Sequence, residues 1–310
     1  MVTRMIIDTD AGVDDAQAIM MALTHPNVRV EAITTVYGNV SLDKVIPNVC
    51  LTLDVMRKNV PVYAGADRPL VSEWFHADDV HGSDGLGDLP NRPTSYRRIE
   101  DEHAALALVR LANRYPGELT LVVLGPQTNV ALATKLDPAF PSKLKQLVFM
   151  GGTISAMGNS PMAGAEFNTY CDPEATYIVL KSFARATMLS WETTLQHPVS
   201  WDRFDRLAAT PTEAGRFFRA MTNRISALLK PISWAGGYLI PDPLAMAAAI
   251  EPDLVTSRSD YYVTVELQGA HTRGQTVLDY FGQKSQPANV DVINGLDMDR
   301  VLRLFQHMLA

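Results

Sequence analysis

The sequence predicts an α/β fold in which a mostly parallel sheet is flanked by helices. Strand-like and helix-like segments alternate along most of the chain, which is the βαβα pattern of parallel sheets covered by helices. The chain has 310 residues, 47% of them hydrophobic, so it can bury a large core. No linker, repeat or low-complexity stretch divides residues 1–310, which favours a single domain.

The first two elements are expected within the first 23 residues. Met5–Ile7 is an apolar run typical of a short buried strand. Asp14 opens an amphipathic helix whose apolar residues have helical spacing: Ala16, Ile19, Met20 and Leu23. Gly12 is expected to supply the tight turn between them.

The later elements follow the same alternation. Further strands are expected at Val28–Val36, Val60–Tyr63, Leu119–Leu124, Leu144–Met150 and Ala186–Leu189. Further helices are expected at Leu42–Met56, His103–Asn113, Asn129–Lys135, Pro173–Lys181 and Leu244–Ile250. Tyr261–Leu267 and Gln275–Tyr280, joined through Gly269 and Gly274, predict a hairpin at a sheet edge. Three long non-periodic segments are expected to be functional or mobile loops: Gly65–Glu100, Gly151–Phe167 and Thr193–Thr210.

The loop after the first strand is strongly acidic. Asp8, Asp10, Asp14 and Asp15 crowd the carboxyl end of that strand, where open α/β sheets place their ligands. A helix N-terminus favours one or two Asp residues through capping and its dipole, but not four. Because like charges repel unless a cation holds them, and oxygen ligands suit calcium or magnesium, the loop predicts a metal site.

Composition and charge exclude several classes of function. A net charge of −7 and the absence of a basic run argue against a nucleic-acid partner or an anionic membrane surface. No apolar stretch approaches a membrane span, and the chain enters its first strand without room for a signal peptide. Two distant cysteines give no disulfide framework and no thiolate metal site. We therefore expect a soluble cytoplasmic protein.

Motifs along the chain resemble the nucleoside hydrolase family, the calcium-dependent inosine–uridine-preferring enzymes. The segment D-T-D-A-G-V-D-D, from residue 8, is close to the family signature. Blocks that match the family follow in the same order: T-T-V-Y-G-N (34–39), P-V-Y-A-G-A (61–66), H-G-S-D-G-L-G (81–87), L-G-P-Q-T-N (124–129), M-G-G (150–152), E-F-N (166–168), D-P-E-A (172–175) and D-P-L-A (242–245). The resemblance implies a Rossmann-like domain, a homodimer or homotetramer, that hydrolyses the N-glycosidic bond of ribonucleosides.

The resemblance also implies roles for individual residues. Calcium would be held by Asp10, Asp15, Asp242 and the backbone carbonyl of Leu124. The ribose hydroxyls would also ligate the ion. They would be bound by Asp14, Asn39 and Asn168, while Asn159 and Glu166 would reach the rest of the sugar.

The chemistry of the reaction fits these residue types. N-ribosyl cleavage passes through an oxocarbenium-like state, so carboxylates and amides around the sugar stabilise its positive charge. A metal-bound water has a lowered pKa, and Asp10 is placed to accept its proton as general base. Since no residue is an obvious nucleophile, direct attack by water is expected.

Several residues are candidates for contact with the leaving base. Many members of the family carry a histidine directly before the last calcium-binding Asp, where it protonates the base; here that residue is Pro241. Activation of the base then falls to His81, His76 or an aromatic residue, or the base is a better leaving group. Phe167 is a candidate for the pocket wall. Among the tryptophans, Trp234 has the best prospect of a functional role, because a glycine-flanked segment places it just before Asp242.

Two alternatives remain open from the sequence. Residues 6–10 resemble the start of a haloacid dehalogenase-type phosphohydrolase, but the later lysine and acidic pair of that class are not evident. The second alternative is a non-catalytic ribose- or nucleoside-binding protein that lost leaving-group activation with Pro241. An EF-hand is not favoured, because Gly12 falls one position early and a strand precedes the loop.

Overall fold

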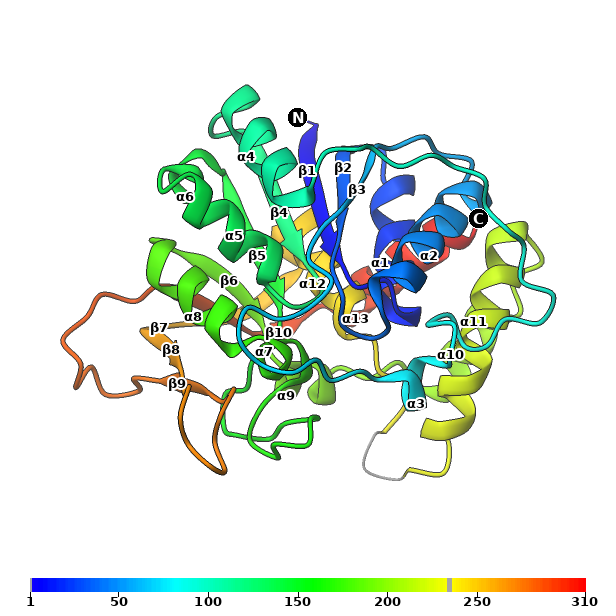
Figure 1. Ribbon diagram of the computed structural model, residues 1–310. Helices are drawn as coiled ribbons and strands as arrows, with labels where there is room; N and C mark the ends of the chain where they lie inside the picture. The colour runs from blue at the N-terminus through cyan, green and yellow to red at the C-terminus, as the bar shows by residue number, and fades with distance from the viewer. Residues whose placement is uncertain (1, 233–235) are drawn as a thin grey trace.

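The computed structural model describes residues 2–232 and 236–310. Within these residues the fold is α/β, with an eight-stranded sheet in the order β3-β2-β1-β4-β5-β6-β10-β7 (Figure 1). Neighbouring strands pair in parallel from β3 to β10, and β7 runs antiparallel to β10 at one edge. A mostly parallel sheet is what the alternation of strands and helices predicted.

The strands of the sheet are β1 (Thr3–Thr9), β2 (Val28–Thr35), β3 (Val62–Ala64), β4 (Leu119–Val123), β5 (Gln146–Met150), β6 (Ala186–Leu189), β7 (Val255–Tyr261) and β10 (Val290–Leu296). A separate hairpin is formed by β8 (Val263–Val265) and β9 (Thr276–Leu278). The longer helices are α1 (Val13–Thr24), α2 (Leu42–Val55), α4 (Ala104–Arg114), α5 (Thr128–Leu136), α8 (Pro173–Ser182), α11 (Glu213–Leu229), α12 (Pro241–Ile250) and α13 (Met298–Leu309). The shorter helices are α3 (Asp78–His81), α6 (Phe140–Lys143), α7 (Phe167–Cys171), α9 (Trp191–Gln196), α10 (Trp201–Ala208) and the 3₁₀ turn η2 (Pro252–Leu254).

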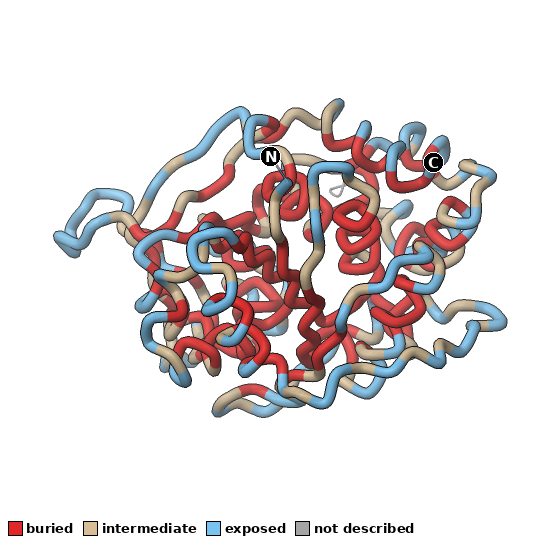
Figure 2. Tube along the Cα trace, turned by 90° about the horizontal axis from the view of Figure 1, so that it is seen from above, coloured by how far each residue is buried: buried red, intermediate tan, exposed pale blue. Residues whose placement is uncertain are grey.

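Two hydrophobic layers cover the two faces of the sheet. Along β1, Met5 and Ile7 pack into the core shared with α1, α11, α12 and α13, while Ile6 packs against α4 and α5. This alternation follows from the twofold side-chain period of a strand. Figure 2 shows the buried strands at the centre of the molecule and the exposed segments around its rim. Burial on both faces explains why Met5–Ile7 of β1 and most of β4 are continuous apolar runs.

The order of the strands indicates where a ligand site is expected. The first six strands follow the order 3-2-1-4-5-6 of dinucleotide-binding Rossmann sheets, in which the connections reverse between β1 and β4. Open α/β sheets bind ligands beyond the carboxyl ends of the strands at that point. Asp10 follows β1 and Leu124 follows β4, so the acidic loop lies at this edge.

Two expectations about later segments are wrong. The predicted hairpin forms, but among the described residues β8 and β9 pair only with each other, and β7 is the edge strand instead. The segment Thr193–Thr210 is largely helical, because α10 buries Phe204 and Leu207 at helical spacing. No helix within residues 2–232 or 236–310 combines the length and the apolar run needed to cross a bilayer.

Candidate active site

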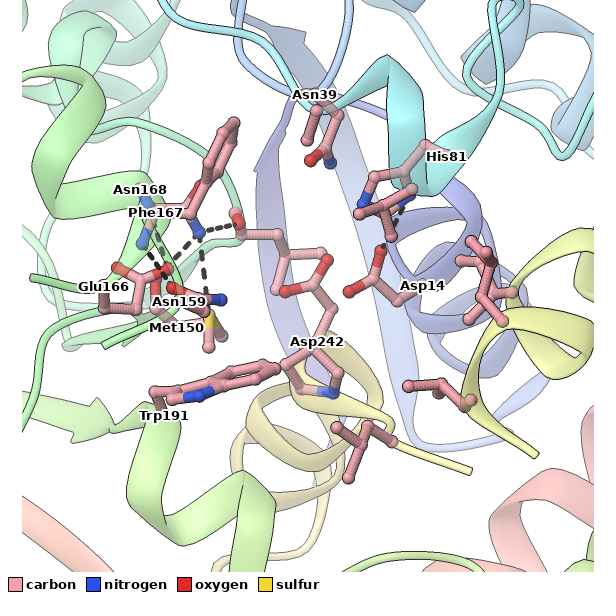
Figure 3. A pocket seen from close by; sticks show the side chains of 18 of the residues that line it. Asp14, Asn39, His81, Met150, Asn159, Glu166, Phe167, Asn168, Trp191 and Asp242 are labelled. Carbon is pink, nitrogen blue, oxygen red and sulfur yellow. Dashed lines mark hydrogen bonds and ion pairs between the residues drawn. The ribbon is translucent and has the colours of Figure 1, made fainter. Parts of the chain in front are cut away.

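A pocket of about 530 Å³ opens at the carboxyl ends of β1, β4 and β5. Acidic and amide side chains line one part of it, among them Asp14, Asn39, Asn159, Glu166, Asn168 and Asp242 (Figure 3). Apolar side chains of α11 and its C-terminal continuation line another part, namely Ile225, Leu228, Leu229 and Ile232. The pocket therefore offers a polar compartment beside an apolar one.

Three carboxylates from distant parts of the chain meet at the polar end. Asp14, Asp15 and Asp242 each offer an oxygen, and these oxygens lie within 4.8 Å of one another. Asp14 and Asp15 are in the first turn of α1, and Asp242 is in the first turn of α12. Asp242 is not an N-cap, because Ile240 holds that position and Pro241 is the first helical residue. The packing of α12 beside α1 brings the three together.

Asp10 is outside this group of three and is not among the residues lining the pocket, but it lies close enough to Asp15 and Asp14 for their charges to raise its pKa. The backbone N–H of Asn39 donates to Asp10 Oδ2 at 2.7 Å, whereas Asp10 Oδ1 is buried without a hydrogen-bond partner among the described residues. Asp15 accepts from the Gly12 N–H (2.8 Å) and from Asn39 Nδ2 (3.0 Å). Asn39 thus fixes Asp10 and Asp15 relative to each other.

Burial and mutual repulsion make the ionised form of these carboxyl groups unfavourable when no cation is bound. Burial raises the pKa of Asp14 to about 7, with Asp15 adding to the shift. Burial, and then the neighbouring Asp residues, raise the pKa of Asp10 and Asp242 well above the usual range. The buried Oδ1 atoms of Asp10 and Asp14 have no hydrogen-bond partner within the described residues. A hard divalent cation fits this donor set, because it would neutralise the charge and use the free oxygens.

Asp8 does not belong to the cluster, contrary to the expectation of four crowded carboxylates. It lies inside β1, and its Oδ1 accepts from Thr34 Oγ1 and from Asn129 Nδ2 (2.9 Å). Burial raises its pKa to about 7. The strand extends to Thr9, so Asp8 follows the alternation of side chains in β1 instead of the loop.

The sequence predicted that Gly12 supplies a tight turn. The structure instead requires glycine there because two side chains approach its Cα closely. Its φ is −79°, which any residue adopts, and the positive φ of the loop (29°) belongs to Ala11. A Cβ at Gly12 would lie 2.5 Å from Asn39 Nδ2 and 2.6 Å from His81 Nδ1. Glycine lets these two side chains pack against the start of α1.

The polar wall opposite Asp14 is built by the loop after β5 and by α7. Glu166 caps α7, accepting from the N–H groups of Asn168 (2.9 Å) and Thr169 (3.0 Å). Burial raises its pKa to about 7. Asn168 Nδ2 donates to the Leu124 carbonyl at 2.6 Å, and Asn159 Oδ1 accepts from the Phe167 N–H at 2.8 Å. All of these residues except Thr169 line the pocket.

His81 lies beside the start of α1. The Val13 N–H donates to its Nδ1 at 3.1 Å, so the proton of the neutral ring is on Nε2. Burial lowers the pKa of His81 to about 4, although the nearby Asp15 and Asp79 act in the opposite direction. At neutral pH His81 is therefore an uncharged hydrogen-bond donor. His76 is exposed beside Asp78 (2.8 Å) and is not among the residues lining the pocket.

Several lining residues were not identified from the sequence. Trp191 and Tyr238 line the pocket, as do Val80 and the apolar face of α11. The amphipathic spacing of α11 signals a helix, but no local pattern shows that its face points into a pocket. Trp234, the tryptophan favoured from the sequence, lies outside the described residues.

Comparison with known proteins gives one consistent family. The model of the family described as "Inosine-uridine preferring nucleoside hydrolase" matches residues 5–303. Pyrimidine-specific ribonucleoside hydrolase RihB of Escherichia coli strain SE11 is 34% identical over 300 residues, spanning 96% of this chain and 93% of that protein.

Solved structures agree in fold over the whole chain. An inosine-guanosine nucleoside hydrolase has a TM-score of 0.92 at 36% identity, covering 100% of this chain and 99% of its own. A purine-preferring ribonucleoside hydrolase from Gardnerella vaginalis has a TM-score of 0.90 at 31% identity, with coverage of 99% and 98%.

Proposed function

Because this chain belongs to the inosine–uridine preferring nucleoside hydrolase family, we propose that it hydrolyses the N-glycosidic bond of ribonucleosides to a free base and ribose. The observation that best supports this proposal is a pocket with a carboxylate and amide end beside an apolar end. The first suits a sugar with several hydroxyls, and the second suits a nucleobase. The relatives are named for pyrimidine, inosine–guanosine and purine nucleosides, so their names do not select one base.

Calcium is the proposed metal. Asp10, Asp15, Asp242 and the Leu124 carbonyl would hold it. Oxygens of Asp15 and Asp242 lie within 4.8 Å of each other, and Asp10 Oδ1 is buried without a hydrogen-bond partner among the described residues. When bound, the ion would lower the pKa of a water and bind the ribose hydroxyls. These ligands are all oxygen atoms, which is the donor set that a hard cation prefers.

The chain's own residues carry the remaining steps. Asp10 Oδ1 accepts the proton of the attacking water, since Oδ2 is already held by the Asn39 N–H. Asp14, Asn39 and Asn168 bind the 2′- and 3′-hydroxyls, and Asn159 and Glu166 contact the rest of the sugar. The carboxylates also stabilise the positive charge that develops on the ribose ring.

Departure of the base receives limited help from this pocket. Pro241 has no ionisable group, and His81 offers a neutral Nε2–H in place of a cationic acid. His81 is therefore proposed to assist catalysis by donating a hydrogen bond to the base as it leaves.

A substrate with an activated leaving group is expected to show that this pocket protonates the leaving base poorly. Help from a general acid is typically worth about 10²–10⁴-fold in rate. p-Nitrophenyl riboside, which needs little protonation, should therefore be cleaved much faster than inosine or uridine. His81→Ala should depress cleavage of the nucleosides strongly and of the activated riboside little. Equal rates of wild-type cleavage on both kinds of substrate would show that an unidentified proton donor exists.

Removing the metal is expected to abolish most activity and to make stability depend on pH. Without a cation, the folded-state pKa values of Asp10, Asp14 and Asp242 are raised above the value of about 3.9 in an unfolded chain. The folded state then holds more protons, so stability falls as pH rises from about 4 towards 7 and beyond. The melting temperature after chelation, measured at pH 5 and pH 8 with and without added calcium, checks this. Unchanged turnover and melting temperature in the stripped protein would rule out the metal.

The proposed function is tested by incubating the protein with purine, pyrimidine and modified ribonucleosides and assaying free ribose as reducing sugar. Neither alternative from the sequence is favoured, because the relatives are named nucleoside hydrolases. A panel without any ribose release would overturn the proposal. The homo-oligomeric state and cytoplasmic location expected from the sequence stay predictions.

A further inference from the structure

We propose that Glu192 is a positioning residue that holds loop 154–157 and thereby places Asn159 at the pocket. Glu192 is the second residue of α9 and is only 4% exposed, but it is not among the residues lining the pocket. The inference rests on the proposed function for its kinetic readout. It concerns a residue outside the set expected to touch the metal or the substrate.

The side chain of Glu192 binds the loop through three backbone N–H groups. Its Oε2 accepts from the Ile154 N–H at 2.8 Å. Its Oε1 accepts from the N–H groups of Ser155 (2.7 Å) and Met157 (3.2 Å), and from the Ser155 hydroxyl (3.2 Å). Successive backbone N–H groups that converge on one carboxylate form a nest. The structure fills this nest with a side chain 35 to 38 residues away in sequence.

The nest depends on an unfavourable backbone conformation. Ala156, between two of the donors, has a φ of 60°, in the left-handed region that L-residues with a Cβ seldom adopt. Residues 155–157 are exposed, so apolar burial contributes little to holding them. The bonds to Glu192 offset the cost of the left-handed residue. The Tyr280 hydroxyl also donates to the Ile154 carbonyl, so losing Glu192 would loosen the loop without releasing it completely.

The loop continues directly into a residue of the pocket. The Gly158 N–H donates to the Ala163 carbonyl (2.8 Å), and the Asn159 N–H donates to the Ala165 carbonyl (3.2 Å). Asn159 Oδ1 accepts from the Phe167 N–H, so the group that Asn159 offers to a substrate is its Nδ2 amide. A displacement of loop 154–157 would shift this amide relative to the other residues that line the pocket.

The start of α9 joins the same loop to a second wall of the pocket. The Trp191 N–H donates to the Gly152 carbonyl at 3.1 Å, and the Trp191 side chain lines the pocket. Figure 3 shows Trp191 and Asn159 on the same side of the pocket. Trp191 and Glu192 are adjacent in α9. The first contributes its side chain to the pocket wall, and the second holds the loop that leads to Asn159.

The test is Glu192→Gln, which keeps the size of the side chain but replaces one acceptor oxygen with a group that only donates. We expect KM for a cleaved ribonucleoside to rise about 10-fold while kcat changes by less than about threefold, because a contact made equally in ground and transition state is lost. Glu192→Asp, which keeps both acceptors, should recover part of the affinity. Glu266→Gln is the control, since Glu266 also accepts two backbone N–H groups (2.7 and 3.0 Å), but the residues it holds, Gln268 and Gly269, are not connected, within the described residues, to a residue that lines the pocket.

Two measurements separate positioning from a merely structural role. If Glu192 acts through Asn159, adding Glu192→Gln to Asn159→Ala should raise KM no further than Asn159→Ala alone. Hydrogen exchange of amides 154–157 should be faster in folded Glu192→Gln than in the wild type. An unchanged KM in a folded Glu192→Gln protein, or fully additive effects, would overturn the inference. If the wild type cleaves no ribonucleoside, the proposed function fails, and unchanged exchange at 154–157 would then overturn the inference by itself.

Discussion

Asp10→Asn is expected to lower the turnover of ribonucleosides by about 100-fold or more while the protein stays folded. The asparagine amide cannot take the proton of the attacking water at the position of Oδ1, and it is a weaker ligand for a hard cation. The measurement is kcat for the best ribonucleoside, at saturating calcium, in wild type and variant. Circular dichroism of both proteins establishes that the fold is intact.

Asp8→Asn is the matched control for this variant. Asp8 lies two residues earlier, inside β1, and is equally buried, but its Oδ1 accepts from Thr34 and Asn129, whereas Asp10 lies close to Asp14 and Asp15. Since burial already raises the pKa of Asp8 to about 7, the neutral amide resembles a form that the carboxyl itself adopts. We expect turnover of Asp8→Asn within a few-fold of the wild type. Near-normal turnover in Asp10→Asn would move the general base to another residue.

A 2′-deoxyribonucleoside is expected to be an extremely poor substrate. A site that bonds a substrate hydroxyl leaves its own buried polar groups unpaired when that hydroxyl is missing, which costs about 10⁴-fold or more in kcat/KM. Here the Oδ1 atom of Asp14 is buried without a hydrogen-bond partner among the described residues, so it is free to accept from the sugar. The check is the ratio of kcat/KM for a ribonucleoside and its 2′-deoxy analogue.

Variants of the sugar-binding residues sharpen that comparison. Asp14→Ala should lower kcat/KM for the ribonucleoside far more than for the deoxynucleoside, and so shrink the ratio between them. Glu266→Gln, outside the pocket lining, should leave the ratio unchanged. Comparable efficiency of the wild type on both sugars would contradict the roles proposed for Asp14, Asn39 and Asn168.

Much of the fold could be predicted because its signals are local. β6 has the predicted bounds of Ala186–Leu189, and the strands and helices predicted up to that point form with ends shifted by a few residues. The later hairpin was assigned to the wrong sheet, because strand pairing depends on residues far away in sequence. β10 occupies the position beside β6, and β7 pairs with β10 at the edge, so β8 and β9 are left to pair with each other.

The sequence by itself determined that an acidic loop follows the first strand. Asp10, Asp14 and Asp15 lie within six residues after an apolar strand, and a strand end followed by a helix start places such residues at one edge of a sheet whatever the rest of the chain does. The matching motif blocks added the family, and with it candidates far along the chain. All of these signals depend on residue order or on spacing within one element.

Only the tertiary structure decided how the remaining parts of the pocket come together. Asp242 meets Asp14 and Asp15 because α12 packs beside α1, and the apolar face of α11 closes the opposite end. Glu192 reaches the nest of loop 154–157 from the start of another helix. Gly12 is needed because Asn39 and His81 pack against it. Each of these contacts joins residues far apart in the sequence, and periodicity within one element carries no information about which elements will touch.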